Sequence, residues 1–156
     1  MNKAKKNPHY VNNKEFYDAL LNYKIKVDAA KEKGLPRPQI TNYLGDCFLK
    51  IATHLSYRPN FVNYMFREDM ISDGVENCVQ YISNFDVEKT NPFAYFTQIV
   101  YYAFLRRIQK EKRQMEIKEK ILEKSGFDQV FSVDGDVHFS SDYNTIKENI
   151  QIKLYQ

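Results

Sequence analysis

The sequence of 156 residues is poor in the residue types on which several protein classes depend. It has only two cysteines, no tryptophan, five glycines and five prolines. Two cysteines are too few for the disulfide framework of a small secreted domain. Cys47 and Cys78 fall on apolar stripes of helical spacing, so we expect reduced core residues of a cytosolic protein. No apolar run approaches the roughly 18 residues of a membrane-spanning helix, so we expect no membrane partner.

Motifs for catalysis and for metal binding are also missing. The sequence has no glycine-rich phosphate loop and no Ser-His-Asp or Cys-His order typical of a nucleophilic centre. The histidines, His9, His54 and His138, are widely scattered. Residues 134–138 include two aspartates but lack the closing glutamate of a calcium loop, so we interpret them as a polar turn. We therefore expect no enzymatic activity, no metal and no cofactor.

What the sequence does contain predicts one all-α domain, a compact helical bundle. Apolar residues make up 43% of the chain, which excludes wholesale disorder, and they recur at helical rather than strand spacing. We place the domain at residues 8–126. Residues 127–156 change in composition, with five acids and two lysines, and we expect a poorly structured C-terminal tail.

Capping residues and breakers divide this domain into four expected helices. The first begins at Asn12 or Asn13 and ends near Gly34, and the second runs from about residue 41 to residue 58. An acidic helix over 68–84 follows, and Thr90-Asn91-Pro92 restarts a helix that continues to about residue 113 with a charged extension. The apolar stripe expected in the first helix is Phe16, Tyr17, Leu20, Leu21 and Ile25. The stripe expected in the acidic helix is Ile71, Val75, Cys78, Ile82 and Phe85.

The third and fourth expected helices carry opposite charges. Residues 68–88 contain six acidic residues and no basic one, whereas residues 89–113 contain six basic residues and one acid, Glu111. An acidic helix beside a basic, aromatic-rich helix predicts one surface for a basic protein partner and another for nucleic acid.

A helical wheel of residues 93–113 separates two faces at about 100° per residue. The core stripe is Phe93, Phe96, Val100, Phe104 and Ile108. The outer face is Tyr95, Gln98, Tyr102, Arg106, Gln109, Lys110 and Arg113, with Ile99 among them. Exposed tyrosines can stack on unpaired bases while Arg and Lys neutralise phosphates. The simpler alternative is a solvated helix face that happens to contain tyrosines.

Three stretches of this region resemble region two of bacterial sigma factors. They are the acidic helix from Asp69 to the Asn84-Phe-Asp motif, the aromatic Pro92-Phe-Ala-Tyr-Phe-Thr motif and the pair Arg106-Arg107. Together with Tyr10-Val-Asn-Asn-Lys-Glu and Asn91-Pro-Phe-Ala-Tyr, the pattern is more closely similar to the late-promoter sigma factors of T-even-type bacteriophages. This similarity covers about residues 8–126.

The resemblance implies a transcription initiation factor for phage late genes, acting in the cytoplasm of the infected bacterial host. Its partners would be bacterial core RNA polymerase, through the β′ clamp helices, and promoter DNA. It would recognise and melt an AT-rich minus-ten element and flip an adenine of the melted non-template strand into an aromatic pocket. By position, the polymerase-binding residues would be Asp69, Ser72, Asp73, Val75, Glu76 and Gln80. The DNA-binding residues would be Phe85, Lys89, Tyr95, Phe96, Gln98, Ile99, Tyr101, Tyr102, Arg106, Arg107, Lys110 and Arg113.

The sequence also departs from that family. The tryptophan pair of housekeeping factors falls at Ile99 and Val100, and Phe96 is assigned both to the core stripe and to base stacking. No second helical domain follows for an upstream promoter element. In the phage relatives a C-terminal peptide that binds the replication sliding clamp takes over that role. Here residues 149–156 offer Ile150, Ile152, Leu154 and Tyr155 without a matching acidic motif, so we expect either a divergent clamp-binding peptide or a segment that packs locally.

Two other functions remain open at this point. A stand-alone helical DNA-binding regulator would need a short helix-turn-helix turn and a dimer surface, but the turn at 87–91 is longer and no heptads occur. A polymerase-binding protein that does not contact DNA would leave the tyrosine-arginine face without a role. Strong duplex binding without polymerase would favour the first alternative.

Overall fold

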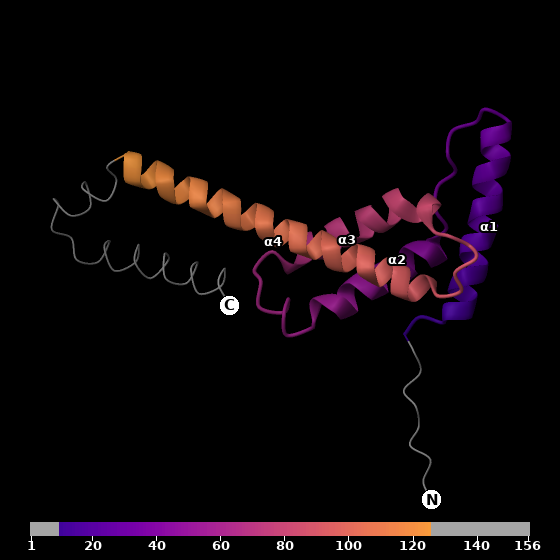
Figure 1. Cartoon of the computed structure of the whole chain (residues 1–156), viewed down its shortest axis with the longest axis horizontal. Helices are drawn as coiled ribbons and strands as arrows, with labels where there is room; N and C mark the ends of the chain where they lie inside the picture. Colours follow the sequence, from indigo (N-terminus) through magenta and orange to yellow (C-terminus); the bar gives the residue numbers. More distant parts are fainter. Residues whose placement is uncertain (1–9, 126–156) are drawn as a thin grey trace, which may run out of the picture.

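The computed structural model describes residues 10–125, and within them every regular element is helical. The elements are α1 (Asn13–Glu32), α2 (Asn42–Ser56), α3 (Arg67–Tyr81), the 3-10 turn η1 (Ile82–Asn84) and α4 (Pro92–Lys124). The predicted all-helical fold is confirmed. Helices α2 and α3 lie along the first part of α4, α1 crosses one end of this layer, and the second part of α4 extends past the other helices (Figure 1). Residues 126–156, with the expected clamp-binding peptide, lie outside the described residues.

The helices begin where capping side chains satisfy free backbone N–H groups. The Asn12 side chain accepts hydrogen bonds from the N–H groups of the first turn of α1, and Thr41 does the same for α2. At the start of α4, the Asn91 side chain accepts from the Ala94 N–H at 3.2 Å, and Pro92 occupies the first helical position. The sequence predicted these three helix starts.

The core of the bundle is an aromatic cluster shared by three helices. Phe16 of α1, Phe48 of α2 and Phe96 of α4 have no solvent exposure. The Phe48 and Phe96 ring centroids lie 4.8 Å apart, and those of Phe16 and Phe96 lie 5.5 Å apart. Aromatic pairs at such distances stabilise a fold by about 0.5–1.5 kcal/mol beyond their burial. This cluster fixes α1 and α2 against the first half of α4.

The structure corrects two of the expected apolar stripes. In α1 the buried residues are Phe16, Leu20 and Tyr23, while Ile25 is 66% exposed because its side of the helix faces no other element. In α3 the fully buried stripe is Met70, Gly74 and Cys78, with Ile71 and Val75 only half-buried. Cys78, Ile82 and Phe85 are buried as expected. The first half of the expected stripe is off by one residue, because the pattern gave no weight to a glycine as a packing position.

Candidate nucleic-acid and protein interface

Helices α3 and α4 pack closely in antiparallel orientation. Near one end Asp73 contacts Arg107, and near the other the Tyr95 hydroxyl donates to the Tyr81 carbonyl at 3.4 Å. Between them, a Cβ atom built on Gly74 would lie only 3.0 Å from Val100 Cγ1 and 3.2 Å from Phe104 Cε1. Glycine thus permits the close approach that places the acidic and basic helices side by side.

The outward face of α3 carries most of the predicted polymerase-binding residues. Ser72, Glu76 and Gln80 are exposed at intervals of one turn, as is Asp69, and Val75 is half-buried beside them. A negatively charged strip of this kind, with an apolar edge, suits a basic protein surface.

Asp73 and Arg107 form an ion pair with each other rather than lying on separate binding surfaces. Arg107 donates through Nε and Nη2 to the two Asp73 carboxylate oxygens, the Nη2–Oδ1 distance being 2.8 Å, and through Nη1 to Glu111 at 3.3 Å. Hydrogen bonding to Asp73 raises the pKa of Arg107 further above its usual range. The resemblance assigned Asp73 to polymerase binding and Arg107 to DNA. Two carboxylates instead neutralise this guanidinium, so both expectations are corrected.

Two tyrosines of α4 present rings to solvent. Tyr102 is 50% exposed and Tyr101 is 36% exposed, and their ring centroids lie 5.9 Å apart in an edge-to-face arrangement. The other edge of Tyr101 is fixed by Phe61, whose ring centroid is 5.7 Å away. Tyr95 is half-buried, and burial raises the pKa of its phenol.

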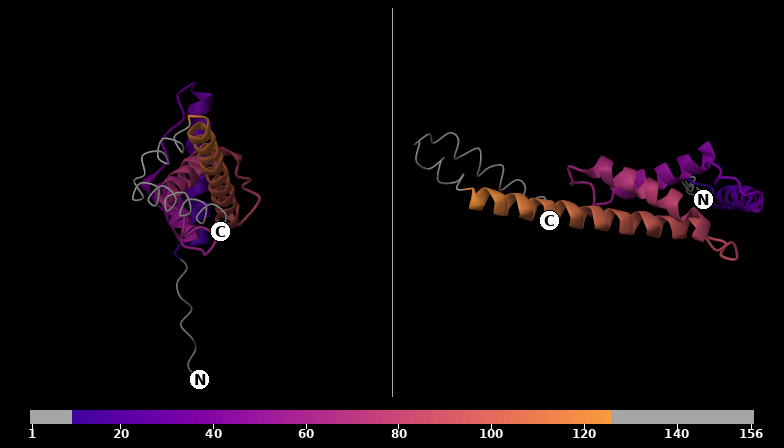
Figure 2. Two further views of the ribbon diagram at one scale, coloured as in Figure 1. Left: turned by 90° about the vertical axis from the view of Figure 1, so that its left-hand side faces the viewer. Right: turned by 90° about the horizontal axis from the view of Figure 1, so that it is seen from above.

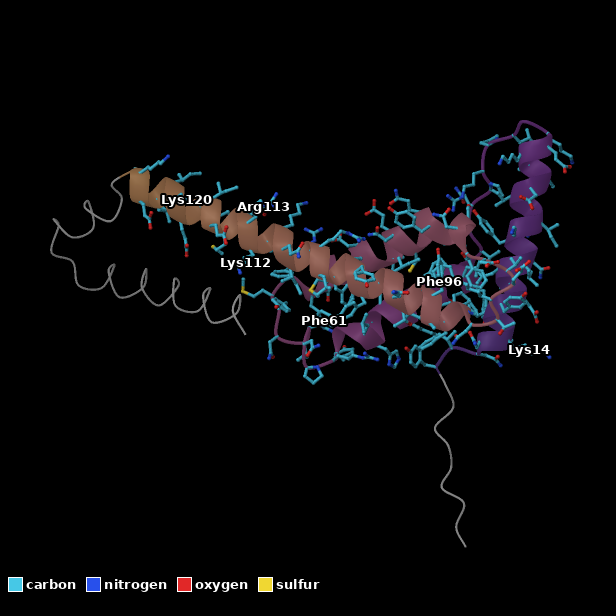
Figure 3. All side chains as sticks on the ribbon, viewed as in Figure 1. Lys14, Phe61, Phe96, Lys112, Arg113 and Lys120 are labelled. Carbon is cyan, nitrogen blue, oxygen red and sulfur yellow. The ribbon has the colours of Figure 1, made fainter. Side chains whose placement is uncertain are left out.

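Phe85 and Phe96, which the resemblance assigned to the base-binding pocket, belong to the core. Phe96 has no exposed surface and Phe85 is 5% exposed. Their ring centroids are 6.0 Å apart, and Phe96 is enclosed within the bundle (Figure 3). Neither ring can stack on a base without the core opening, so the assignment of Phe96 to stacking is wrong in this structure. The wheel, which placed Phe96 in the core stripe, is confirmed at this position.

An open groove lies instead between α2 and α4, on the side of Tyr101. Its volume is about 490 Å³, and its lining residues are Leu55, Arg58, Phe93, Ala94, Thr97, Gln98, Tyr101 and Tyr102. A smaller hollow of about 190 Å³ continues from it to Tyr10 and His54, whose rings stack at 3.8 Å. The groove therefore combines aromatic rings, an amide and a guanidinium.

Thr97 gives this groove a polar group without a partner. Its Oγ1 atom is buried and makes no hydrogen bond within the described residues. A buried hydroxyl left unpaired costs about 1–3 kcal/mol. Sequence reasoning missed Thr97 and Arg58. Thr97 lies on the wheel within the core stripe, between Phe104 and Ile108, where a hydroxyl gives no binding signal. Arg58 follows the C-terminal end of α2, far from α4 in the sequence, so it carried no local signal either.

The remaining predicted DNA-binding cations and amides are exposed. Arg106 donates to the Asn77 side chain at 3.1 Å and still faces solvent. Lys110 and Arg113 follow it along α4, Gln98 lies at the groove, and Lys89 lies in the turn before α4. Ile99 is half-buried.

No protein-family model matches the chain, and no curated protein has a significantly similar sequence. Among residues 10–125, no helix is long and apolar enough to cross a membrane. The same residues include no cluster of three or more His, Cys, Asp or Glu side chains that could hold a metal ion.

Proposed function

We propose that the protein is a minimal sigma factor that directs bacterial core RNA polymerase to late phage promoters. In this proposal the acidic outer face of α3 binds the polymerase, and α4 captures the melted non-template strand of an AT-rich minus-ten element. The observation that supports it most is the pair of exposed tyrosines, Tyr101 and Tyr102, on a basic helix packed directly against an acidic one.

The energies of stacking and base extrusion are of similar size. Stacking on an aromatic ring contributes about 1–3 kcal/mol per base, and extruding a base from a duplex costs a few kcal/mol. Two tyrosines can therefore offset the extrusion of about one base, with little excess. We infer that strand opening also requires the polymerase, which agrees with the absence of tryptophan from the chain.

The test is reconstitution of the full-length chain with core polymerase on a supercoiled template with an AT-rich promoter. Unpaired thymines detected by permanganate would report opening, and co-purification would report polymerase binding. We expect the double variant Tyr101→Ala/Tyr102→Ala to bind polymerase normally and to lose at least about tenfold in opening, because two stacking surfaces are removed. The matched control is Tyr101→Phe/Tyr102→Phe, which keeps both rings and should keep opening.

Two results would contradict the proposal and favour an alternative. Normal opening by the double alanine variant would favour a polymerase-binding protein that does not contact DNA. Tight, sequence-specific duplex binding at physiological salt without polymerase would favour a stand-alone regulator. Failure to bind core polymerase at all would contradict the proposal directly.

A further inference from the structure

Five cations of α4 lie on one straight face of the helix. At about 100° per residue, Arg106, Lys110, Arg113, Lys120 and Lys124 all fall within about 40° of a single line. All five are exposed. The acids of the same region lie away from that line, at Glu111, Glu116, Glu119 and Glu123. We call these five cations the basic stripe.

Most of the basic stripe lies beyond the reach of the acidic helix. The C-terminal part of α4 extends past the other helices, as the view from above shows (Figure 2, right). Within residues 10–125, none of Lys110, Arg113, Lys120 and Lys124 has an ion-pair partner, whereas Arg107, off this line, is paired twice. Four unpaired charges of one sign on one face repel each other, and a bound polyanion would relieve that repulsion.

We propose that the basic stripe binds the phosphate backbone of double-stranded DNA beside the melted segment. This inference deepens the proposed function and rests on it for the position of the duplex. From Arg106 to Lys124 the stripe is about 27 Å long at 1.5 Å per residue. A DNA duplex places one phosphate per strand every ~3.4 Å, so the stripe spans roughly eight base pairs.

The order of residues along α4 supports a duplex at this end. Tyr102 lies on the same line as the basic stripe, one turn before Arg106. Along one face, the helix therefore presents first a ring suited to an unpaired base and then cations suited to phosphates. Backbone contacts of this type position a protein on DNA without reading its sequence.

An anionic lipid surface fits the distal part of α4 less well. A helix that lies in a membrane interface has a broad apolar face opposite its cations. Here the opposite side is a narrow seam of Ile108, Met115 and Leu122, which are half-buried and flanked by charged residues on both sides. Ile117, which is 51% exposed, lies on the stripe itself. Ile121, which is 59% exposed, lies beside it one turn further on. Two apolar side chains next to cations are compatible with a groove of DNA and give little insertion into lipid.

The test compares two triple variants of the full-length chain that each remove three lysine or arginine charges. The stripe variant is Arg113→Gln/Lys120→Gln/Lys124→Gln. The control is Lys24→Gln/Lys26→Gln/Lys118→Gln, which removes exposed charges from α1 and from another face of α4. Fluorescence anisotropy at about 50 mM salt would measure binding to a 30-base-pair duplex of random sequence and to vesicles rich in phosphatidylserine. Circular dichroism would check that both variants remain folded.

We expect the parent chain to bind the duplex at low salt and the stripe variant to lose at least about tenfold in affinity, because each lost cation removes about one released counterion. For the same reason the slope of log K against log salt should become shallower by about two to three. The control should change little. The DNA arm needs no polymerase, so it gives an answer even if the protein fails to bind polymerase and the proposed function is wrong.

Three results would overturn the inference. The first is no duplex binding by the parent chain at low salt. The second is an equal loss in both triple variants, which would indicate net charge rather than a stripe. The third is binding to the vesicles in preference to the duplex, which would assign the stripe to a lipid surface.

Discussion

Gly74 lies where α3 packs closely against α4. A methyl group added there would meet Val100 and Phe104, both fully buried, at 3.0 and 3.2 Å. Neither neighbour adjusts easily, because branching at Cβ restricts the rotamers of Val100 and Phe104 packs against Phe61 at a centroid distance of 5.2 Å. The separation of α3 and α4 therefore depends on one missing side chain.

We expect Gly74→Val to lower the free energy of unfolding by about 1–3 kcal/mol, because overpacking forces the two helices apart. The matched control is Gly45→Ala in α2, where the new methyl group would meet only Ile40 Cδ1 at 3.8 Å. That control should raise stability by up to about 1 kcal/mol, because alanine is the better helix former. Urea unfolding followed by circular dichroism would measure both. Equal stability of the Gly74→Val variant and the parent would contradict the close packing described here.

The buried thiol of Cys78 gives a prediction that depends on pH. Burial raises its pKa from 9.0 to about 12, and Cys47 is also buried with a raised pKa. In the unfolded chain the thiol loses its proton near pH 9, while in the folded chain it keeps the proton to about pH 12. The contribution of Cys78 to stability is thus complete below pH 9 and is lost as pH rises toward 12.

We therefore expect neither thiol to react rapidly with Ellman's reagent in the native protein at pH 8, and both to react after unfolding in guanidinium. Between pH 9 and 11 the stability of the parent should fall more steeply than that of Cys78→Ala, by up to about 1.4 kcal/mol per pH unit. Fast reaction of both thiols in the native protein would contradict the burial of Cys47 and Cys78 described here.

Single residues also mark the limit of what the sequence could predict. The wheel placed Phe96 in the core because an apolar ring at helical spacing is usually buried, and the structure agrees. The base-stacking role came only from the resemblance, and packing against Phe16 and Phe48 excludes it in this structure. Thr97 and Arg58 were not predicted, because the groove that brings them together is built from two helices distant in sequence.

Among the helices, the boundaries were easier to predict than the pairing of their faces. The helix starts at Asn12, Thr41 and Asn91 follow from local capping chemistry, which sequence alone specifies. The ion pair between Asp73 and Arg107 joins residues 34 positions apart, and no local pattern indicates that the two helices cross at that point. The charge pattern therefore predicted which helix is acidic and which is basic. The packing of the two helices determines which of these charges remain exposed for binding a partner.

This pairing predicts different roles for the neighbouring arginines Arg106 and Arg107. We expect Asp73→Asn and Arg107→Gln each to lower stability by about 0.5–1.5 kcal/mol, because the bidentate pair is largely screened from solvent at 26% and 19% exposure. The double variant should lower stability by less than the sum of the two single variants, as a double-mutant cycle would measure.

At low salt, Arg106→Gln should weaken duplex binding more than Arg107→Gln. The opposite order would contradict the assignment of Arg107 to helix packing.

In the molecule as a whole, the outer face of α3 and the basic stripe of α4 are two separate exposed surfaces. The outer face of α3 presents Glu76 and Gln80, while α4 presents Tyr102 and the basic stripe. Because Asp73 also stabilises the fold, its charge reversal would disturb both surfaces. Glu76 is exposed and has no ion pair within the described residues. A substitution at Glu76 therefore changes the outer face of α3 without breaking a contact between helices.

We expect Glu76→Lys to weaken binding to core polymerase by about fivefold or more while leaving stability and low-salt duplex binding nearly unchanged, because an exposed charge on a binding surface acts mainly on its partner. Tyr102→Ala should have the reverse pattern, with normal polymerase binding and weaker capture of single-stranded promoter DNA. Combining the two should give both defects without further loss, since distant sites act independently. Binding to labelled polymerase and to a single-stranded oligonucleotide would separate these effects. If Glu76→Lys weakened oligonucleotide binding as much as polymerase binding, the two surfaces would not be distinct.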